Sequence, residues 1–244
     1  MNFSGCQFIR KLPDLLGATP NVKNLDLRYC RKLVKIHDSI GYLDKLESWE
    51  LKGCFELHIL PSCIVMKSLK ILSLLGCERV RRFPNTPQVM ENLKYLSLAH
   101  TAITKLPPSI GNLARLEMLH IGSPFYLCQL PISIYELQHI SQLRFYGNVQ
   151  FPKSVGIGRQ APLNFLKKLT SCFTHLEKTK DLNLQESIIK FNRLHVLVIR
   201  DSKFLKKIPK LPEGIRRIYA YNCVSLNSES IRKSILQVPL PLLK

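Results

Sequence analysis

Apolar residues recur at a fixed period along this chain. Equivalent apolar anchors stand 23 or 24 residues apart, at Val22, Leu46, Leu69, Leu93, Leu116 and Ile140. Each anchor opens the phrase L-x-x-L-x-L-x-x-C, which is clearest from Leu69 to Cys77. A fixed period of this length indicates stacked units, because one unit cannot bury its own apolar side alone. We therefore expect a solenoid that forms a single domain over residues 1–244.

Within the phrase, the fourth and sixth positions alternate with their neighbours as in a half-buried strand. Leu25 and Leu27 are examples, and we expect such pairs to point into the core of a parallel sheet on the concave face. A Leu-Pro step such as Leu106-Pro107 follows and interrupts backbone pairing. Residues 109–111 and 133–134 then predict single turns of α- or 3₁₀-helix on the convex face. The predicted fold class is a curved α/β solenoid with little long helix.

The regularity of the phrase divides the chain. Residues 1–155 are predicted as regular repeats, 156–193 as a degenerate or looped segment, 194–238 as terminal repeats and the array end, and 239–244 as a tail. In the degenerate segment Leu182 and Leu184 can form one strand. Alignment of Cys6 with Cys30 places Met1 at the fourth position of a phrase. We therefore expect the chain to begin inside a repeat strand, without a capping unit, either as a piece of a longer array or as a chain that has lost its upstream part.

Five of the eight cysteines occupy the ninth position of the phrase: Cys6, Cys30, Cys54, Cys77 and Cys223. Stacked strands lie about 4.8 Å apart, so these side chains should form a column. That spacing permits disulfides, and the column superficially resembles a metal site. We favour small side chains that pack inward and hydrogen-bond the loop backbone. Thr101, Asn148 and Ser202 fill the same column and share this role, although they are poor ligands for soft metals. Reduced thiols and the lack of a signal peptide favour the cytosol.

The sequence lacks the common motifs of nucleotide-binding, metal-binding and catalytic sites. The sequence contains no G-x-x-x-x-G-K-[ST], H-E-x-x-H or C-x-x-C, and its seven histidines are dispersed without a triad-like acidic partner. No run of about 18 apolar residues predicts a membrane span. We therefore expect a binding protein with no catalytic residue, cofactor or metal, and no membrane partner.

The outward strand positions predict a contact surface. Positions three, five, seven and eight of each phrase are expected to face outward on the concave side. Arginine mixed with aromatic and apolar residues is typical of protein-binding hot spots, although such positions also vary freely within a repeat family. The predicted partner-binding patch consists of Tyr95, Met118, His120, Arg144, Tyr146, Arg200, Arg217, Tyr219 and Tyr221.

The net charge of +19 indicates a second predicted surface, separate from the concave patch. Many basic residues follow the ninth position and should form a lateral basic flank: Arg31, Lys32, Lys35, Arg79, Arg81, Arg82, Lys105, Lys203, Lys206 and Lys207. Such a flank attracts an acidic protein surface or nucleic acid. We rank an acidic protein first, general solubility second and nucleic acid third. Stacking on bases needs aromatic side chains among the charges, and Phe204 is nearly the only aromatic residue expected there.

The extended phrase L-x-x-L-x-L-x-x-C-x-x-L-x-x-L-P-x-x-I-x-x-L resembles the leucine-rich repeats of plant intracellular nucleotide-binding disease-resistance receptors. Extracellular plant receptors typically have N-x-L-x-G-x-I-P instead. The stretch from Lys207 to Ser228 is similar to the close of the repeat array in the Toll/interleukin-1-receptor-domain subgroup. The matching residues there are Leu211, Pro212, Ile215, Asn222, Cys223, Ser225 and Leu226.

This resemblance implies the sensing and autoinhibitory region of an innate immune receptor. The concave face would contact a pathogen effector or a host protein, and a flank would contact the nucleotide-binding domain of the parent receptor. The implied location is the cytoplasm, and also the nucleus. ATP binding, NAD cleavage and signalling are not carried over, because the sequence lacks the domains that perform them.

Two other classes remain open. A stand-alone cytosolic scaffold of the Ras-signalling type usually has Asn at the ninth position and a steady 23-residue period. A ubiquitin-ligase adaptor would ordinarily carry an F-box or a catalytic cysteine domain. The sequence does not identify the ligand or the oligomeric state.

Overall fold

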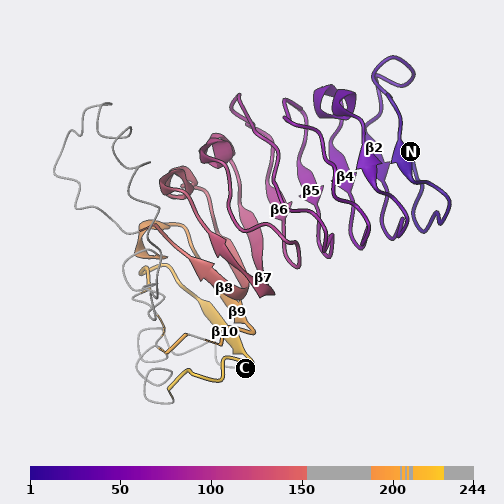
Figure 1. Ribbon diagram of the computed structural model, residues 1–244. Coiled ribbons are helices and arrows are strands. Elements are labelled where there is room, and N and C mark those ends of the chain that lie inside the picture. Colours follow the sequence, from indigo (N-terminus) through magenta and orange to yellow (C-terminus); the bar gives the residue numbers. More distant parts are fainter. Residues whose placement is uncertain (153–187, 204, 207, 209–210, 228–244) are drawn as a thin grey trace, which may run out of the picture.

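The computed structural model describes residues 1–152, 188–203, 205–206, 208 and 211–227. In chain order its elements, with β for strands and η for 3₁₀ helices, are β1 (Lys11–Leu12), β2 (Asn24–Asp26), β3 (Lys35–Ile36), η1 (Asp38–Tyr42), β4 (Ser48–Glu50), β5 (Ile71–Ser73), β6 (Tyr95–Ser97), η2 (Pro108–Asn112), β7 (Met118–Gln129), η3 (Ile132–Glu136), β8 (Gln142–Gln150), η6 (Ile188–Lys190), β9 (Val196–Arg200) and β10 (Arg217–Tyr221). An 8-stranded parallel sheet runs in the order β10-β9-β8-β7-β6-β5-β4-β2, and β1 pairs with β3 in a small second sheet. Figure 1 shows the strands side by side along one curved array. The predicted solenoid with a parallel sheet is confirmed.

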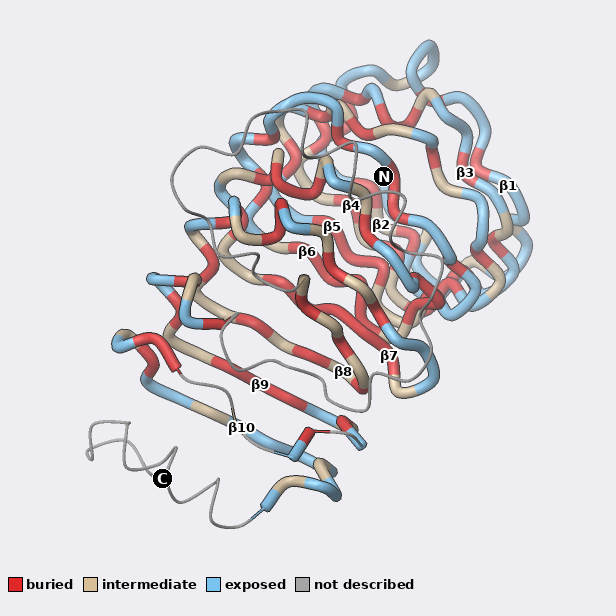
Figure 2. The backbone as a smooth tube through the Cα atoms, turned by 60° about the vertical axis from the view of Figure 1, so that its left-hand side comes forward, coloured by how far each residue is buried: buried red, intermediate tan, exposed pale blue. Residues whose placement is uncertain are grey.

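Equivalent positions of successive repeats lie directly beside one another. Leu25, Trp49, Leu72 and Leu96 are neighbours in the strand register, and all four are buried. The sixth position, represented by Leu27, is buried as well. Figure 2 shows the buried backbone running through the strands, with β10 mostly exposed. The core is therefore one continuous apolar column built from every repeat.

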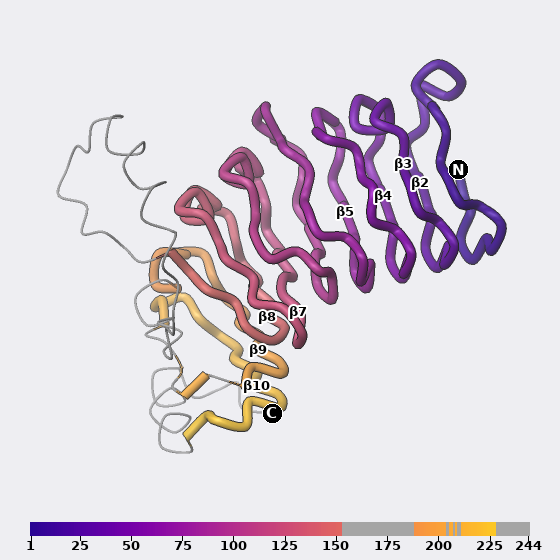
Figure 3. Tube along the Cα trace, viewed as in Figure 1, coloured from indigo at the N-terminus to yellow at the C-terminus, as the bar shows by residue number. Residues whose placement is uncertain are grey.

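In the described part of the chain, the return path of each repeat carries at most a short helical turn. The predicted turns at residues 109–111 and 133–134 lie inside η2 and η3, and both are 3₁₀ helices that begin after an extended proline. These two helices pack against each other. Figure 3 shows how one coil of the chain follows the next along the array. No helix in the described part of the chain is long and apolar enough to cross a membrane.

The eighth position marks the end of the strand in several repeats. Tyr29, His100, Asp201 and Asn222 have φ angles between 53° and 59°, in the left-handed region. This conformation turns the chain out of the strand. In these repeats the strand therefore ends at position seven, and the backbone of position eight belongs to the turn.

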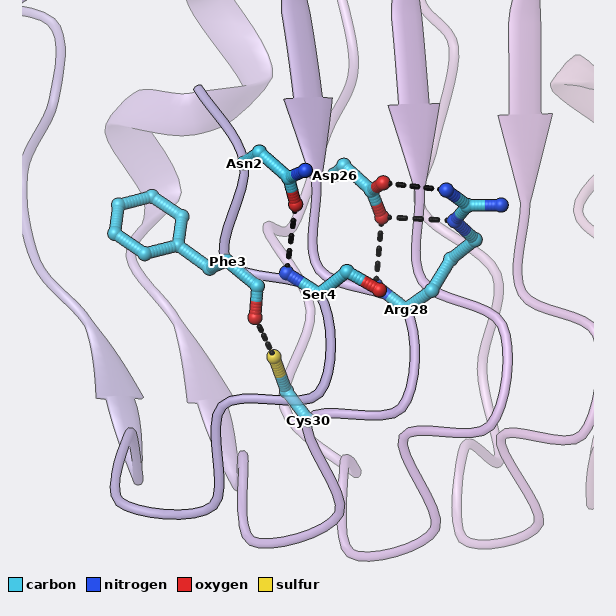
Figure 4. Close-up of polar contacts among 6 residues, drawn as sticks. All are labelled: Asn2, Phe3, Ser4, Asp26, Arg28 and Cys30. Carbon is cyan, nitrogen blue, oxygen red and sulfur yellow. Dashed lines mark hydrogen bonds and ion pairs between the residues drawn. The ribbon is translucent and has the colours of Figure 1, made fainter.

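The cysteine column has the predicted role. The thiols of Cys30, Cys54 and Cys77 donate to main-chain oxygens of the preceding repeat at 3.0 to 3.1 Å. Figure 4 shows the first of these bonds, from Cys30 to the Phe3 oxygen. The cysteines of the described segments are free thiols, and the residues there include no metal-binding cluster. Burial raises the pKa of the Cys30 thiol to about 11, so it stays protonated.

Other side chains in the column behave differently. Thr101 donates from its hydroxyl to the Leu98 oxygen of its own repeat at 2.8 Å. The side-chain oxygen of Asn148 is buried and has no hydrogen-bond partner among the described residues. This oxygen therefore does not bond the loop backbone as predicted. The column therefore tolerates variation where a repeat is irregular.

The sheet continues directly from β8 to β9. Gln142 pairs with Val196, and Phe145 pairs with Ile199, so these two strands are direct neighbours. The described residues place no strand between these two in the sheet. The strand predicted at Leu182 and Leu184, and most of the predicted degenerate segment, lie outside the described residues.

Candidate binding surfaces

The N-terminal end of the concave face carries paired charges. Asp26 accepts from the Arg28 guanidinium at 2.7 Å, and this hydrogen bond is the main reason why the pKa of Asp26 lies below its usual value (Figure 4). In the adjacent strand Glu50 is half-buried, and burial raises the pKa of its carboxyl. This end of the face therefore presents acidic side chains that are partly neutralised by their surroundings.

At the centre of the concave face, the side chains pack against one another and are largely buried. Ser73, Ser97 and Ala99 are buried, and His120 is only 9% exposed. Tyr95 packs edge-on against the His120 ring at 5.1 Å, and its hydroxyl lies 3.3 Å from His120 Nδ1. Burial, followed by the positive charge of Arg144, lowers the pKa of His120 to about 4. The imidazole is therefore neutral at pH 7 and works as a packed part of the sheet face.

The C-terminal end is open and cationic. Tyr219 and Tyr221 stack with centroids 6.1 Å apart, and the Arg200 guanidinium lies 4.5 Å from the Tyr221 ring centroid. Arg217 is exposed next to them on β10. Closer to the centre, His100 packs against the half-buried Tyr146 at 4.8 Å. This end combines flat aromatic rings with guanidinium groups, which favours contact with another protein.

The predicted patch is thus brought onto one face but divided by burial. Tyr95, Met118, Arg144 and Tyr146 are half-buried. The exposed members, Arg200, Arg217, Tyr219 and Tyr221, all lie on β9 and β10. Sequence position alone could not separate the exposed members from the half-buried ones, because the burial of each side chain depends on the side chains of the neighbouring strands.

The predicted basic flank is exposed but not uniform. Its described members are all exposed, and Lys207 lies outside the described residues. Lys35 pairs with Lys11, a further basic residue of this edge, in the small sheet. Two other members have local partners, since Arg79 forms an ion pair with Glu56 and Arg31 lies 5.8 Å from the Phe55 ring centroid.

The flank is also interrupted. Between Lys105 and Lys203, residues 106–152 contain only Arg115 and Arg144 as basic residues. Among the described residues, the stripe of positive charge is therefore strongest from Arg31 to Lys105.

The expectation that this flank is almost free of aromatic residues is wrong. Phe8 and Phe55 follow position nine of their repeats and are exposed, and the Phe55 ring lies beside Arg31 of the flank. Phe125 and Tyr126, at the corresponding point of the sequence within β7, are exposed as well. The sequence carried this signal, because each of them lies within a few residues of position nine, but their exposure was visible only in the structure.

Known proteins with similar sequences give an independent observation. The family described as leucine-rich repeat region matches residues 45–210. The protein SUPPRESSOR OF npr1-1, CONSTITUTIVE 1 from Arabidopsis thaliana is 42% identical over 52% of this chain, and the match covers 8% of that protein. Disease resistance protein RPS4B from Arabidopsis thaliana is 29% identical over 90% of this chain and 19% of its own length. TMV resistance protein N from Nicotiana glutinosa is 25% identical over 91% of this chain and 19% of its own length. The chain therefore spans less than a fifth of each of these relatives.

One solved structure supports the fold. The leucine-rich repeat domain of the type III effector XopL aligns with a TM-score of 0.50 over 86% of this chain and 72% of that chain. At 19% identity this match concerns the fold alone.

Proposed function

The chain belongs to the leucine-rich repeat family, and from this premise we propose that it is the protein-sensing region of a plant disease-resistance receptor. Its relatives are disease-resistance receptors of the Toll/interleukin-1-receptor subgroup, in agreement with the resemblance of its repeats. Protein interaction is the usual role of such a solenoid. The finer proposal is that the concave face recognises a pathogen effector or a host protein in the cytoplasm or the nucleus.

The exposed cluster on β9 and β10 carries this proposal. Arg200, Arg217, Tyr219 and Tyr221 place two guanidinium groups and two stacked rings on one open surface. Positions three, five and seven of β7 to β10 include no acidic residue in the described structure. A partner surface that carries carboxylates near apolar side chains complements this chemistry.

The basic flank supports a second contact within the proposed function. Arg81, Arg82 and Lys105 are exposed, and no described residue forms an ion pair with them. An acidic surface on the nucleotide-binding domain of the parent receptor would fit this flank and hold the receptor inactive.

The alternative function is that of a stand-alone cytosolic scaffold or adaptor. An in-frame nucleotide-binding sequence upstream of Met1 in the gene would favour the receptor, and its absence would favour the scaffold.

Proximity labelling in challenged plant cells tests the concave contact. The variant Arg200→Glu/Tyr219→Ala/Tyr221→Ala is compared with a control, Ile132→Ser/Ile189→Ser, which changes exposed side chains on the 3₁₀ helices. We expect proteins that are labelled with the wild type and the control to be lost with the concave variant. If all three chains label the same proteins equally, the concave face does not carry recognition.

A further inference from the structure

A protrusion of apolar side chains interrupts the flank at β7. This strand pairs with β8 in register as far as Ser123 and Gly147, and the pairing resumes at Cys128 and Val149. Pro124 to Leu127 therefore stand opposite Asn148 alone. An ordinary bulge accommodates one extra residue, so the surplus chain here is extruded from the sheet.

The base of the protrusion is tightly held. Gly147 has a φ of 68°, and a Cβ atom at this position would lie 2.0 Å from the Ser123 oxygen. The Ser123 hydroxyl accepts from the Phe125 amide at 3.3 Å, which closes a local turn. Cys128 is buried on the other side. The segment therefore has an anchored base on each side, and it presents its side chains in a defined direction.

Those side chains are apolar and point to solvent. Phe125 is 83% exposed, and Tyr126 and Leu127 are 44% and 41% exposed. Three consecutive exposed apolar residues on an anchored base favour contact with a partner, because exposure of such surface in water is unfavourable. Phenylalanine and tyrosine supply large contact areas with few rotatable bonds.

The surrounding charges define the partner. Lys105 lies in register with Gln129, next to the protrusion, and is exposed. The segment from Ala99 to Pro131 contains Glu117 as its only acidic residue, and Glu117 is paired with Lys94 at 3.0 Å. On the side of Lys105, carboxylates of a partner would therefore meet a positive charge without a competing acid.

A nucleic acid fits this place less well. It needs several phosphate contacts, whereas residues 106–152 provide only Arg115 and Arg144. Leu127 also offers no ring for base stacking. The protrusion lies where the basic flank is interrupted, so its exposed surface offers more apolar contact than positive charge.

We propose that Phe125, Tyr126 and Leu127 form a wedge that inserts into an apolar pocket of a protein partner whose rim bears carboxylates on the side of Lys105. This site is separate from the concave cluster on β9 and β10. It gives the molecule a second protein-binding surface.

A displayed library of random 16-residue peptides, selected on the wild-type chain, tests this site. The selected peptides are then measured against Phe125→Ser/Tyr126→Ser/Leu127→Ser, against Lys105→Glu, and against the control Ile132→Ser, which removes an apolar side chain of similar exposure on η3. We expect peptides that combine apolar residues with carboxylates, and a loss of affinity of roughly 30-fold or more in the triple variant. Lys105→Glu should cause a smaller, salt-dependent loss, and Ile132→Ser should cause none.

Three results would overturn the wedge. The first is equal affinity of the selected peptides for the wild type and the triple variant. The second is a set of peptides without carboxylates that Lys105→Glu leaves unaffected. The third is comparable binding of a single-stranded oligonucleotide of fifteen thymidines that the triple variant loses, which would make the site a nucleic-acid site. If the triple variant does not fold, the single change Phe125→Ala is measured instead. Failure here leaves the concave proposal intact, since the concave variant is measured separately.

Discussion

The thiol of Cys54 donates a hydrogen bond of 3.0 Å to the main-chain oxygen of Leu27 in the preceding repeat. The bond joins position nine of one repeat to position six of the repeat before it. Cys30 and Cys77 make the equivalent bonds. The column therefore ties each turn to its neighbour, in addition to the strand pairing.

Replacement of Cys54 by alanine should destabilise the fold. The change removes a buried hydrogen bond worth about 1 kcal/mol and leaves a small void in the core. We expect the free energy of unfolding to fall by about 1–3 kcal/mol. Urea unfolding measures this through the fluorescence of Trp49, the single tryptophan, which is buried. Cys63→Ala, a change at a half-buried cysteine outside the column, is the control and should shift stability by less than about 0.5 kcal/mol. Equal effects of the two changes would argue against the role of the column.

Acid should weaken the centre of the concave face through His120. Its folded pKa of about 4 lies below the unfolded value of 6.5, so the unfolded chain binds the proton more readily. The contribution of His120 to stability is therefore complete above pH 6.5 and is lost as the pH falls to about 4. With 1.36 kcal/mol per pKa unit, this loss is roughly 3 kcal/mol. Urea unfolding between pH 7 and pH 4 should show a shallower pH dependence for His120→Gln than for the wild type. Parallel curves would refute the assignment.

Two glycines with similar backbone angles should respond differently to substitution. Gly147 and Gly76 have φ angles of 68° and 75°, so alanine is strained at both. At Gly76 the nearest atoms to an added Cβ are 3.8 Å away, whereas at Gly147 the Ser123 oxygen would be 2.0 Å away. We expect Gly76→Ala to cost about 1 kcal/mol and Gly147→Ala to cost about 3 kcal/mol or more. Thermal unfolding of the two variants tests this order, and a larger effect at Gly76 would contradict it.

The basic flank should make binding of acidic chains sensitive to salt. Poly-glutamate serves as the probe, because it carries carboxylates without rings or phosphates. Raising the salt concentration from about 0.05 M to 0.2 M shortens the screening length, so the affinity of the wild type should fall by roughly tenfold. Arg81→Glu/Arg82→Glu should bind more weakly, with a flatter salt dependence. The control Lys45→Glu changes an exposed lysine outside the flank and should behave like the wild type apart from a small uniform shift. Binding that does not depend on salt would exclude an electrostatic role for the flank.

Much of the fold could be predicted from local pattern. Alternation at positions four and six identified Leu25 and Leu27 as core residues, and the Leu-Pro steps located η2 and η3. The role of the cysteines followed as well, because a column of small side chains at a turn has few other uses. The left-handed turn at Tyr29 was missed, since an aromatic residue at positive φ carries no signal in sequence.

The candidate surfaces were less predictable. His120 was assigned to the contact patch by its position, but Tyr95 and the small neighbouring side chains bury it. The run from Phe125 to Leu127 was not predicted as a surface, because its exposure follows from the interrupted pairing between β7 and β8.

The sequence by itself determined the solenoid, its parallel sheet, its core and its cysteine column. These features depend on periodicity, because every repeat buries the same positions against the next repeat at a fixed spacing. Only the tertiary structure decided which outward side chains are accessible and where apolar residues leave the strand register. Those properties depend on the side chains that neighbouring strands bring together and on the register at one irregular pair, β7 and β8. Local pattern does not encode either of them.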